Sequence, residues 1–237
     1  MLNLDFTGRH VVVTGGTGAL GAAVIQLLID AGAVCHVPAF RQPQGAVHER
    51  VHIQSNIDLT DESAVGKFYD SLPSLWASIH TAGGFAAAAI ADTSLAVWKQ
   101  MHDTNSVTSF LCCREAIKKI RRTNADGGGG GGRGGRIVNV AAKPALIPTA
   151  GLSAYSASKA AVVSLTVSLS EELAAEKIWV NAVVPSIMDT PMNRQAMPKA
   201  EHDKWPKVSE VAATIAFLAS PQNQVTRGAL VPVYGRS

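Results

Sequence analysis

The sequence predicts an α/β fold, a doubly wound parallel sheet in a single domain, on three observations. Short apolar runs alternate with longer segments of helical periodicity along the 237 residues, which favours a parallel sheet covered by helices on both faces. A glycine-rich turn lies directly between the first apolar run and the first helical segment. Hydrophobic residues make up 47% of the chain and charged residues 16%, which suffices for a large core.

The expected strands are short apolar stretches, and they are residues 9–13, 34–39, 51–53, 75–80, 136–140, 178–183 and 229–233. The expected helices cover residues 22–31, 95–120, 155–173 and 208–219. Thr60 or Asp61 is expected to cap a further helix. Asn105 falls in the middle of the second expected helix, where asparagine is unfavourable, and its pattern alone predicts an exposed polar residue.

Composition excludes several classes of function. The net charge is +3 and the Lys and Arg residues are scattered, so no nucleic-acid-binding or membrane-binding stripe is expected. No apolar run reaches the ~18 residues that span a bilayer, and the amino terminus has no secretory signature. Cys35, Cys112 and Cys113 have neither metal-ligand nor disulfide spacing, which predicts reduced thiols, no metal and a cytoplasmic location.

One low-complexity segment, residues 126–135, is rich in glycine. A phosphate-binding loop is one reading, but no strand precedes the glycines and no Lys-Ser or Lys-Thr pair follows them. We expect a flexible surface connection between a helix and the next strand, and not a domain boundary.

The first glycine turn predicts a dinucleotide site. It follows a strand and opens a helix, so its glycines would let the backbone turn tightly and approach a pyrophosphate at the helix N-terminus. The alternative is an ordinary tight turn between a strand and a helix. The candidate cofactor-binding residues here are Gly15, Thr17, Gly18, Ala19, Leu20 and Gly21.

The end of the second expected strand bears on the choice of cofactor. An acidic residue there would bind the ribose hydroxyls of NAD(H), whereas an arginine suits the 2′-phosphate of NADP(H). The sequence has Ala39, Phe40 and Arg41, with no acid. It therefore favours NADP(H), with Arg41 as the phosphate partner and NAD(H) as the alternative, although Arg41 could equally be a solvated loop charge.

Tyr155 and Lys159 are spaced four residues apart in a segment of helical periodicity. Residues at this spacing lie on one face of a helix, so the ammonium is expected to lower the pKa of the phenol. A phenol tuned in this way could donate or accept a proton near neutral pH. The spacing also arises by chance on exposed helix faces, so it gains weight only from the other motifs.

Those motifs occur in a fixed order, and together they identify a family resemblance. They are Thr14 to Gly21, Asp58, Ala82-Gly83, Asn105, Tyr155 to Lys159, and Asn181 to Thr190. In this order the chain resembles the short-chain dehydrogenase/reductase family from about Gly8 to Gly235. The resemblance implies a Rossmann-type domain and NAD(P)-dependent hydride transfer between a nicotinamide and a small to medium carbonyl or alcohol.

The resemblance also implies roles for single residues. Tyr155 would be the general acid/base, Lys159 would hold the nicotinamide ribose and lower the pKa of the phenol, and Asn105 would bind a water that relays protons. Further cofactor contacts would come from Asp58 and Leu59 at the adenine, from Ala82, Gly83 and Gly84 on the ribose side, and from Pro185 to Thr190 over the nicotinamide.

One departure from the family pattern bears on catalysis. The family's catalytic serine, thirteen residues before the tyrosine, is replaced by Ala142. Loss of one donor to a reacting oxygen typically costs about a hundred- to a thousandfold in rate. The enzyme could be slow, its substrate could need no second donor, or Ser153 or a substrate hydroxyl could replace the serine.

Smaller departures are Ala19 for a fingerprint glycine and Ser186 for a glycine after Pro185, and the carboxyl terminus is also altered. We expect cofactor binding to survive them. Candidate walls of the substrate pocket are apolar, beneath a loop from Pro185 to Trp205 that would act as a lid, and ordinary packing is the alternative reading. These candidate residues are Phe85, Ala142, Leu146, Ile147, Met188 and Met192.

Two alternatives to a carbonyl reductase remain open. The missing serine would suit reduction of a conjugated imine, because the chain is similar in its glycine motif to dihydropteridine reductases, which also lack the serine. It would also suit a catalytically weak protein that senses a dinucleotide. The resemblance further implies a homodimer or homotetramer through the Asn105 and Tyr155 helices, helped by the small residues Ala157, Ala160, Ala161, Ser164 and Ser168.

Overall fold

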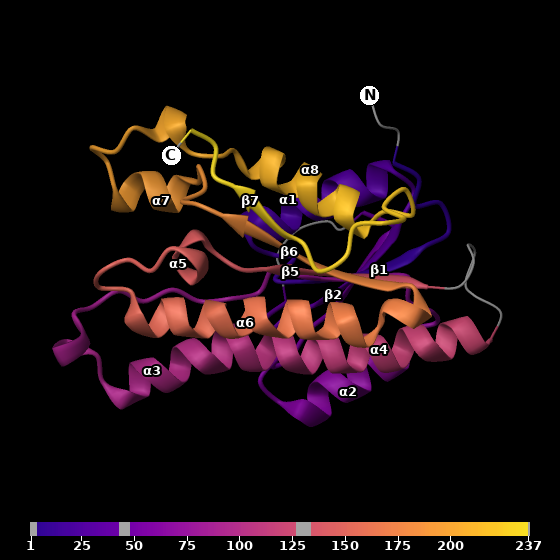
Figure 1. The fold of residues 1–237 in the computed structure, drawn as a ribbon. Coiled ribbons are helices and arrows are strands. Elements are labelled where there is room, and N and C mark those ends of the chain that lie inside the picture. The colour runs from indigo at the N-terminus through magenta and orange to yellow at the C-terminus, as the bar shows by residue number, and fades with distance from the viewer. Residues whose placement is uncertain (1–3, 43–47, 127–133, 237) are drawn as a thin grey trace.

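The computed structural model describes residues 4–42, 48–126 and 134–236. Its centre is a seven-stranded sheet in the order β3-β2-β1-β4-β5-β6-β7, and every neighbouring pair is parallel (Figure 1). The strands are β1 His10–Thr14, β2 Val34–Pro38, β3 Val51–Gln54, β4 Ala77–His80, β5 Gly135–Val140, β6 Ile178–Pro185 and β7 Leu230–Val233. The order reverses between β1 and β4, which is where ligands bind in doubly wound sheets. The predicted fold class is confirmed.

Helices cover both faces of the sheet. On one face lie α1 Ala19–Asp30 and α8 Val208–Ala219, and on the other lie α2 Glu62–Ser71, α4 Thr108–Ala125 and α6 Ser153–Glu172 (Figure 1). Shorter elements are α3 Leu95–Met101, α5 Lys143–Leu146, α7 Pro191–Ala196, the π-helix η2 His102–Val107, and the 3₁₀ helices η1 Ile90–Asp92, η3 Ala174–Glu176 and η4 His202–Lys204.

The central strands β1, β4, β5 and β6 are buried along almost their whole length, because both of their faces pack against helices. Val11 and Val13 belong to the core beneath α1 and α8, whereas Val12 belongs to the core beneath α2 and α4. This alternation follows the two-residue period of a strand. Strand β1 is thus buried between the two cores, and the glycine turn follows its carboxyl end.

Helix α1 begins three residues earlier than predicted, because the glycines that look like a turn also form the first helical turn. Gly18 is the N-cap, and Gly21 lies inside the helix. A methyl group on Gly21 would lie 2.3 Å from the carbonyl oxygen of Gly15, so only glycine fits this position. Helix propensity alone therefore places the start of the helix too late in the sequence.

The long helix expected at residues 95–120 is interrupted. Residues His102–Val107 form a π-helical segment between α3 and α4. Asn105 lies in this segment and is fully buried, so the expectation of an exposed polar residue is wrong. Such single widened turns occur often at functional sites, since the inserted residue redirects a side chain.

Two expectations about regions outside the strands can be compared with the structure. Residues 127–133 of the glycine-rich connection lie outside the described residues. The segment expected to be a loop from Pro185 to Trp205 contains α7 and η4. Thr190 caps α7 and Pro191 occupies its first turn, a Thr-Pro signal that the sequence already carries. Among the described residues, no helix is long and apolar enough to cross a membrane, and no group of side chains could hold a metal ion.

Candidate active site

The glycine turn after β1 forms one side of the site. Gly15 has a φ of +66°, and a methyl group on it would lie 2.7 Å from the backbone nitrogen of Ala82. The N-cap of α1, Gly18, makes no side-chain cap, and Thr17, Gly18 and Ala19 are exposed. The start of the helix is therefore exposed, and the first N–H groups of a helix have no intrahelical partner, an arrangement that suits a phosphate.

The end of β2 lies beside this turn. Ala39 is buried, and its N–H donates to the carbonyl oxygen of Gln54. Arg41 is exposed two residues further along, and no ion pair involves it within the described residues. The position that would hold an acid in an NAD(H) site is thus a buried methyl, with a cationic side chain nearby.

Asp58 and Leu59 follow β3, and both have contacts within the protein. Asp58 Oδ1 accepts hydrogen bonds from the backbone N–H and the hydroxyl of Thr60, at 2.8 and 2.7 Å, and these bonds lower the pKa of the Asp58 carboxyl. Leu59 packs against the core beneath α2. A contact of either residue with adenine stays a prediction.

The segment after β4 joins the glycine turn to the predicted catalytic residues. Ala82 touches Gly15 on one side, as described above. On the other side, a methyl group on Gly83 would lie 2.7 Å from Asn105 Oδ1 and 3.2 Å from Lys159 Nζ. Ala82, Gly83, Asn105 and Lys159 are therefore brought together at the carboxyl end of the sheet, next to the fingerprint.

The side chain of Asn105 makes three hydrogen bonds within the protein. Its Oδ1 accepts from the N–H of Gly84 at 3.0 Å, and its Nδ2 donates to the Gly84 carbonyl at 3.1 Å and to Ser158 Oγ at 3.0 Å. The π-helical turn aims the amide at these partners. Sequence analysis did not single out Ser158, although a polar residue among small ones, one position before Lys159, was the available signal. Binding of a water by Asn105 stays a prediction.

Lys159 is a buried cation. Its Nζ donates to the carbonyl oxygen of Val140 at 2.8 Å, and burial lowers the pKa of the ammonium to about 8. Sequence motifs describe side chains only, so they do not predict a contact with a backbone carbonyl at the end of β5. The lysine is therefore fixed against the sheet and close to Gly83.

Tyr155 differs from the prediction in one respect. Burial raises the pKa of its phenol to about 12, whereas the spacing to Lys159 predicts a lower value. The cost of removing a phenolate from water outweighs the nearby charge, because the lysine ammonium is directed to Val140. The ring of Phe85 packs edge-on against the ring of Tyr155, with 5.0 Å between centroids.

The position of the missing serine is well defined. Ala142 is 5% exposed and is the N-cap residue of α5. Ser153, two residues before Tyr155, has a buried hydroxyl, and among the described residues nothing forms a hydrogen bond with it. Of the replacement donors considered above, Ser153 therefore has a hydroxyl with no partner within the described residues, as does Ser156 on the other side of Tyr155.

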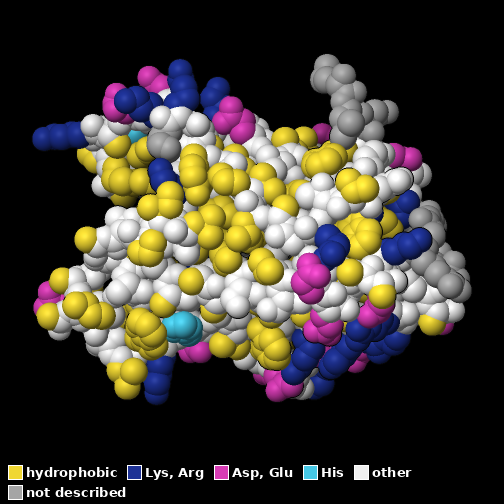
Figure 2. All heavy atoms as spheres, in the orientation of Figure 1, with side chains coloured by type: hydrophobic (Ala, Val, Ile, Leu, Met, Phe, Trp, Pro, Cys, Tyr) yellow, Lys and Arg dark blue, Asp and Glu magenta, His cyan; other side chains and the backbone are white. Residues whose placement is uncertain are grey.

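The predicted pocket walls separate into two groups. Phe85, Leu146, Ile147 and Met192 are exposed, whereas Met188 packs against the core beneath α1 and α8. In Figure 2 the left edge of the molecule is indented below α7, and hydrophobic side chains lie beside the indentation.

The segment after β6 is tied down by its own contacts. Pro185 and Thr190 are buried, and the hydroxyl of Thr190 accepts from the N–H of Asn193. Arg194 binds Asp189 through two hydrogen bonds of 2.6 and 2.8 Å. The hydroxyl of Ser186 donates to the carbonyl of Tyr234, which attaches this segment to the carboxyl-terminal stretch. Contact of Pro185 or Thr190 with a nicotinamide stays a prediction.

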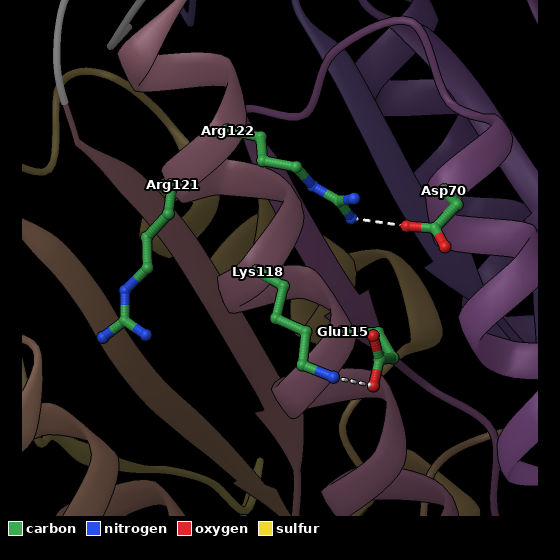
Figure 3. A pocket seen from close by; sticks show the side chains of 5 residues that line it. All are labelled: Asp70, Glu115, Lys118, Arg121 and Arg122. Carbon is green, nitrogen blue, oxygen red and sulfur yellow. Dashed lines mark hydrogen bonds and ion pairs between the residues drawn. The ribbon is translucent and has the colours of Figure 1, made fainter.

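A separate surface hollow lies between α2 and the second half of α4 (Figure 3). Its charged side chains are already paired: Lys118 with Glu115, and Arg122 with Asp70. Arg121 makes no contact with the other residues drawn there, since it binds Glu176 instead. No glycine of the fingerprint and no residue of α6 lines it, so it is not the active site.

Comparison with known proteins agrees with this geometry. A family model described as short chain dehydrogenase matches residues 9–201. A short-chain type dehydrogenase/reductase of Picea abies is 28% identical, over 96% of this chain and 92% of that protein. A cis-4-hydroxycyclohexanecarboxylate dehydrogenase of Sinomonas cyclohexanicum is 30% identical, over 97% and 96%.

A solved structure shares the fold. It is a short-chain type dehydrogenase/reductase from Mycobacterium ulcerans, which superposes with a TM-score of 0.87 at 24% identity and covers 98% of this chain and 90% of that one. The family match, the parallel sheet and the site at its carboxyl edge lead to one conclusion. The chain belongs to the short-chain dehydrogenase/reductase family of oxidoreductases, which use NAD(P)(H).

Proposed function

We propose that this chain is an NADP(H)-preferring carbonyl reductase or alcohol dehydrogenase, with Tyr155 as general acid/base and with Lys159 and Asn105 in support. One observation carries the proposal. The segment Ala82–Gly84 touches the glycine turn through Gly15 and touches Asn105 and Lys159 through Gly83. A ligand lying along this segment would meet both the phosphate site and the proton donor.

The residues present fit a bound dinucleotide. The first turn of α1 would hold its pyrophosphate, since the N–H groups there have no side-chain cap. Arg41 would pair with a 2′-phosphate, because Ala39 offers no carboxylate to a ribose hydroxyl. Ala19 adds one exposed methyl where the family has a glycine, at a position open enough to admit it.

The bound nicotinamide would supply or accept the hydride. Tyr155 would donate its proton to the carbonyl oxygen, since the phenol is protonated at neutral pH; burial makes it a weaker acid, so donation would depend on a cation that stabilises the phenolate. Lys159, whose pKa is lowered to about 8, would still be mostly cationic there and would stabilise the phenolate left behind. Asn105 would hold the Gly83-Gly84 backbone in place through its bonds to Gly84.

The missing serine determines how a substrate is held. The methyl group of Ala142 offers no hydrogen bond, so the reacting oxygen has Tyr155 as its one assigned side-chain donor. Ser153, whose hydroxyl is buried and unpaired among the described residues, would be the replacement, or a hydroxyl of the substrate itself would serve.

The substrate class follows from the pocket walls and a relative. Phe85 packs against Tyr155, and Leu146 and Met192 are further exposed apolar side chains among the candidate walls, which suits a compact ring rather than a sugar. The Sinomonas relative is named for oxidation of a hydroxycyclohexane ring that carries a carboxylate. We extend this to small or medium cyclic alcohols and the corresponding ketones.

Reduction of a conjugated imine, such as a quinonoid dihydropterin, is the second candidate. The observation in its favour is the buried methyl of Ala142, since such a substrate needs no second donor to a carbonyl oxygen. Loss of all chemistry, with dinucleotide binding retained, would explain Ala142 equally. It would not explain why Lys159, on the helix that also carries Tyr155, and Asn105, which packs against that helix, are brought together at Gly83.

A homodimer or homotetramer through α4 and α6 completes the proposal. Phe110 on α4 and Val167 on α6 are exposed hydrophobic residues, and Ala160, Ser164 and Ser168 present a small-residue surface beside them. In Figure 2 the charged side chains of this region gather over the second half of α4 and leave the first half largely uncharged. A second copy would cover this uncharged surface.

The test is a fluorescence titration with NADPH and with NADH, followed by turnover on a panel of cyclic ketones, aliphatic ketones and a quinonoid dihydropterin. The proposal predicts tighter binding of NADPH and turnover of ketones. Turnover of the dihydropterin alone would favour the second candidate. Tight NADPH binding with no turnover of any compound, and no gain in the Ala142→Ser variant, would contradict both.

A further inference from the structure

A line of buried polar side chains crosses the core next to the site, and the proposed reaction does not use it. Tyr69 comes from α2, Ser78 and His80 from β4, Asn139 from β5 and Thr166 from α6. Each of them is at most 2% exposed. A buried polar network of this extent is stable only if all of its members are paired.

All members are paired, through contacts of similar length. The contacts are Tyr69 Oη to Ser78 Oγ at 2.8 Å, Ser78 Oγ to His80 Nε2 at 2.8 Å, His80 Nδ1 to Asn139 Oδ1 at 2.8 Å, Asn139 Nδ2 to Thr166 Oγ1 at 2.9 Å, and Thr166 Oγ1 to the carbonyl oxygen of Val162 at 2.8 Å. We call this line the core chain.

The contact on α6 determines which group donates and which accepts in each hydrogen bond of the core chain. The carbonyl of Val162 can only accept, so Thr166 donates to it and must accept from Asn139. The amide nitrogen of Asn139 therefore faces Thr166, and the amide oxygen faces His80. Because that oxygen can only accept, the proton of His80 must lie on Nδ1.

The rest of the chain follows from this tautomer. Burial lowers the pKa of His80 to about 4, so the ring is neutral and its Nε2 accepts from Ser78. Ser78 in turn accepts from Tyr69. Cys113, whose Sγ lies 3.5 Å from Asn139 Oδ1, gives the same amide oxygen a second donor. Every donor in the core chain points from α2 toward α6.

The core chain ends where Lys159 is held. Lys159, Val162 and Thr166 stand at positions i, i+3 and i+7 of α6, so they share the face that packs on the sheet. Asn139 and Val140 are neighbours at the end of β5. Two hydrogen bonds thus join α6 to β5: Thr166 to the side chain of Asn139, and Lys159 to the carbonyl of Val140.

We infer that His80 is a positioning residue for Lys159, acting through Asn139 and Thr166. His80 holds the Asn139 amide in the one orientation that binds Thr166, and this contact sets how α6 lies along β5. The ammonium of Lys159 then meets Val140 and stays beside Gly83. The effect on catalysis rests on the proposed function, whereas the tautomer and the attachment of α6 do not.

Two measurements need no turnover. Two-bond proton–nitrogen spectra of the protein labelled with nitrogen-15 histidine report the His80 tautomer, and the His80→Leu variant assigns its signals. The inference requires a neutral ring with the proton on Nδ1 at neutral pH. A ring with its proton on Nε2, or a doubly protonated ring, would overturn it.

The second measurement that needs no turnover is hydrogen exchange of the backbone amides in the peptide around Lys159. Thr166→Val removes the hydroxyl and keeps the shape, and Thr166→Ser keeps the hydroxyl. We expect faster exchange in Thr166→Val and His80→Leu, and exchange like that of the original chain in Thr166→Ser. Equal protection in all three variants would overturn the attachment.

Kinetics tests the catalytic consequence. Small displacements of catalytic groups cost about a hundredfold in rate, so we expect kcat to fall by about 10- to 100-fold in Thr166→Val and His80→Leu, with NADPH affinity retained. Thr166→Ser should restore most of kcat. An unchanged kcat in Thr166→Val would overturn the positioning role. If the original chain turns over no carbonyl, the proposed function fails, while the spectra and the exchange still decide whether α6 is attached through His80.

Discussion

Lys159 donates a hydrogen bond of 2.8 Å from its buried Nζ to the carbonyl oxygen of Val140. The bond anchors the cation of the Tyr155–Lys159 pair to the sheet instead of to the phenol. Burial, and not this bond, lowers the pKa of Lys159 to about 8 and raises that of Tyr155 to about 12. Both groups lose water, and burial disfavours the charged form of each. The pair is therefore a protonated donor beside a cation, which suits reduction of a carbonyl.

Restoring a serine at position 142 should accelerate ketone reduction. Ala142→Ser would place a second donor at the oxygen, and one such donor is worth about a hundred- to a thousandfold in other enzymes, so we expect a gain of at least about tenfold in kcat. Ala141→Ser is the matched control, because neighbouring residues on extended backbone point to opposite sides. Equal rates in Ala142→Ser and the original chain would show that Ser153 or the substrate already fills this role.

Removing the charge of Arg41 should weaken selection of NADPH over NADH. A charge-assisted bond to a phosphate in a solvated position is worth about 1.5 kcal/mol, so Arg41→Ala should raise KM for NADPH by about tenfold. KM for NADH should stay the same, and Arg41→Lys should recover part of the loss. Steady-state kinetics with both cofactors measures the ratio. A loss that is equal for NADPH and NADH would remove Arg41 from the phosphate site.

Replacing Arg136 should destabilise the fold strongly. Its buried guanidinium donates to the backbone carbonyls of Ser220, Gly135 and Asn223, and within the described part of the chain it has no carboxylate partner. Arg136→Leu would remove all of these hydrogen bonds from the buried carbonyls, and at about 1–3 kcal/mol for each hydrogen bond to a charged donor the loss should exceed about 3 kcal/mol of unfolding free energy. Urea denaturation checks this.

Arg122 supplies the control for that experiment. It pairs with Asp70 on the surface, and both side chains are more than half exposed. Exposed pairs contribute about 0–1 kcal/mol, so Arg122→Leu should change the unfolding free energy by less than about 1 kcal/mol. Similar losses in Arg136→Leu and Arg122→Leu would contradict the structural role of Arg136.

Stability should fall as the solution becomes mildly acidic. Burial lowers the pKa of His36 and of His80 to about 4 each, from 6.5. Because the unfolded chain binds these protons first, the stabilisation is fully present above pH 6.5 and is lost between 6.5 and about 4. Each of the two histidines adds at most about 1.4 kcal/mol per pH unit to the slope of the unfolding free energy against pH.

The variant His36→Phe tests the source of this slope. Phenylalanine keeps a ring beside His10 and His52, which stack on His36 at centroid distances of 5.1 and 5.3 Å, and it removes the titrating group. Unfolding free energies measured by urea across this pH range should fall less steeply in the variant. An unchanged slope would show that other groups cause the acid sensitivity.

The fold was predictable from the sequence because its rules act locally. Buried strands covered on both faces are continuous apolar runs, as in Val11 to Val13, and their alternation with helices specifies a parallel sheet. The glycine turn was predictable for the same reason. The start of α1 was not, because Gly21 is required by its close approach to the carbonyl of Gly15. Helix propensity, which disfavours glycine, does not report such a contact.

The site was predictable as a set of residues and not as an arrangement. No local pattern reports a π-helical turn, so Asn105 looked exposed although its partners, Gly84 and Ser158, bury it. The direction of the Tyr155 pKa was wrong, since spacing gives proximity and not desolvation. The start of α7 could have been predicted from the sequence, because threonine favours the N-cap and proline the first turn of a helix.

The central claim is that Tyr155 protonates the substrate in a site built around NADPH. Tyr155→Phe keeps the ring packed against Phe85 and removes only the hydroxyl, so the fold and the cofactor site should survive. The decisive measurement is kcat for NADPH-dependent ketone reduction in this variant, together with NADPH affinity in the same preparation. The account predicts a loss of at least about a hundredfold in kcat with affinity retained, as expected for removal of a general acid. Turnover equal to that of the original chain would contradict it.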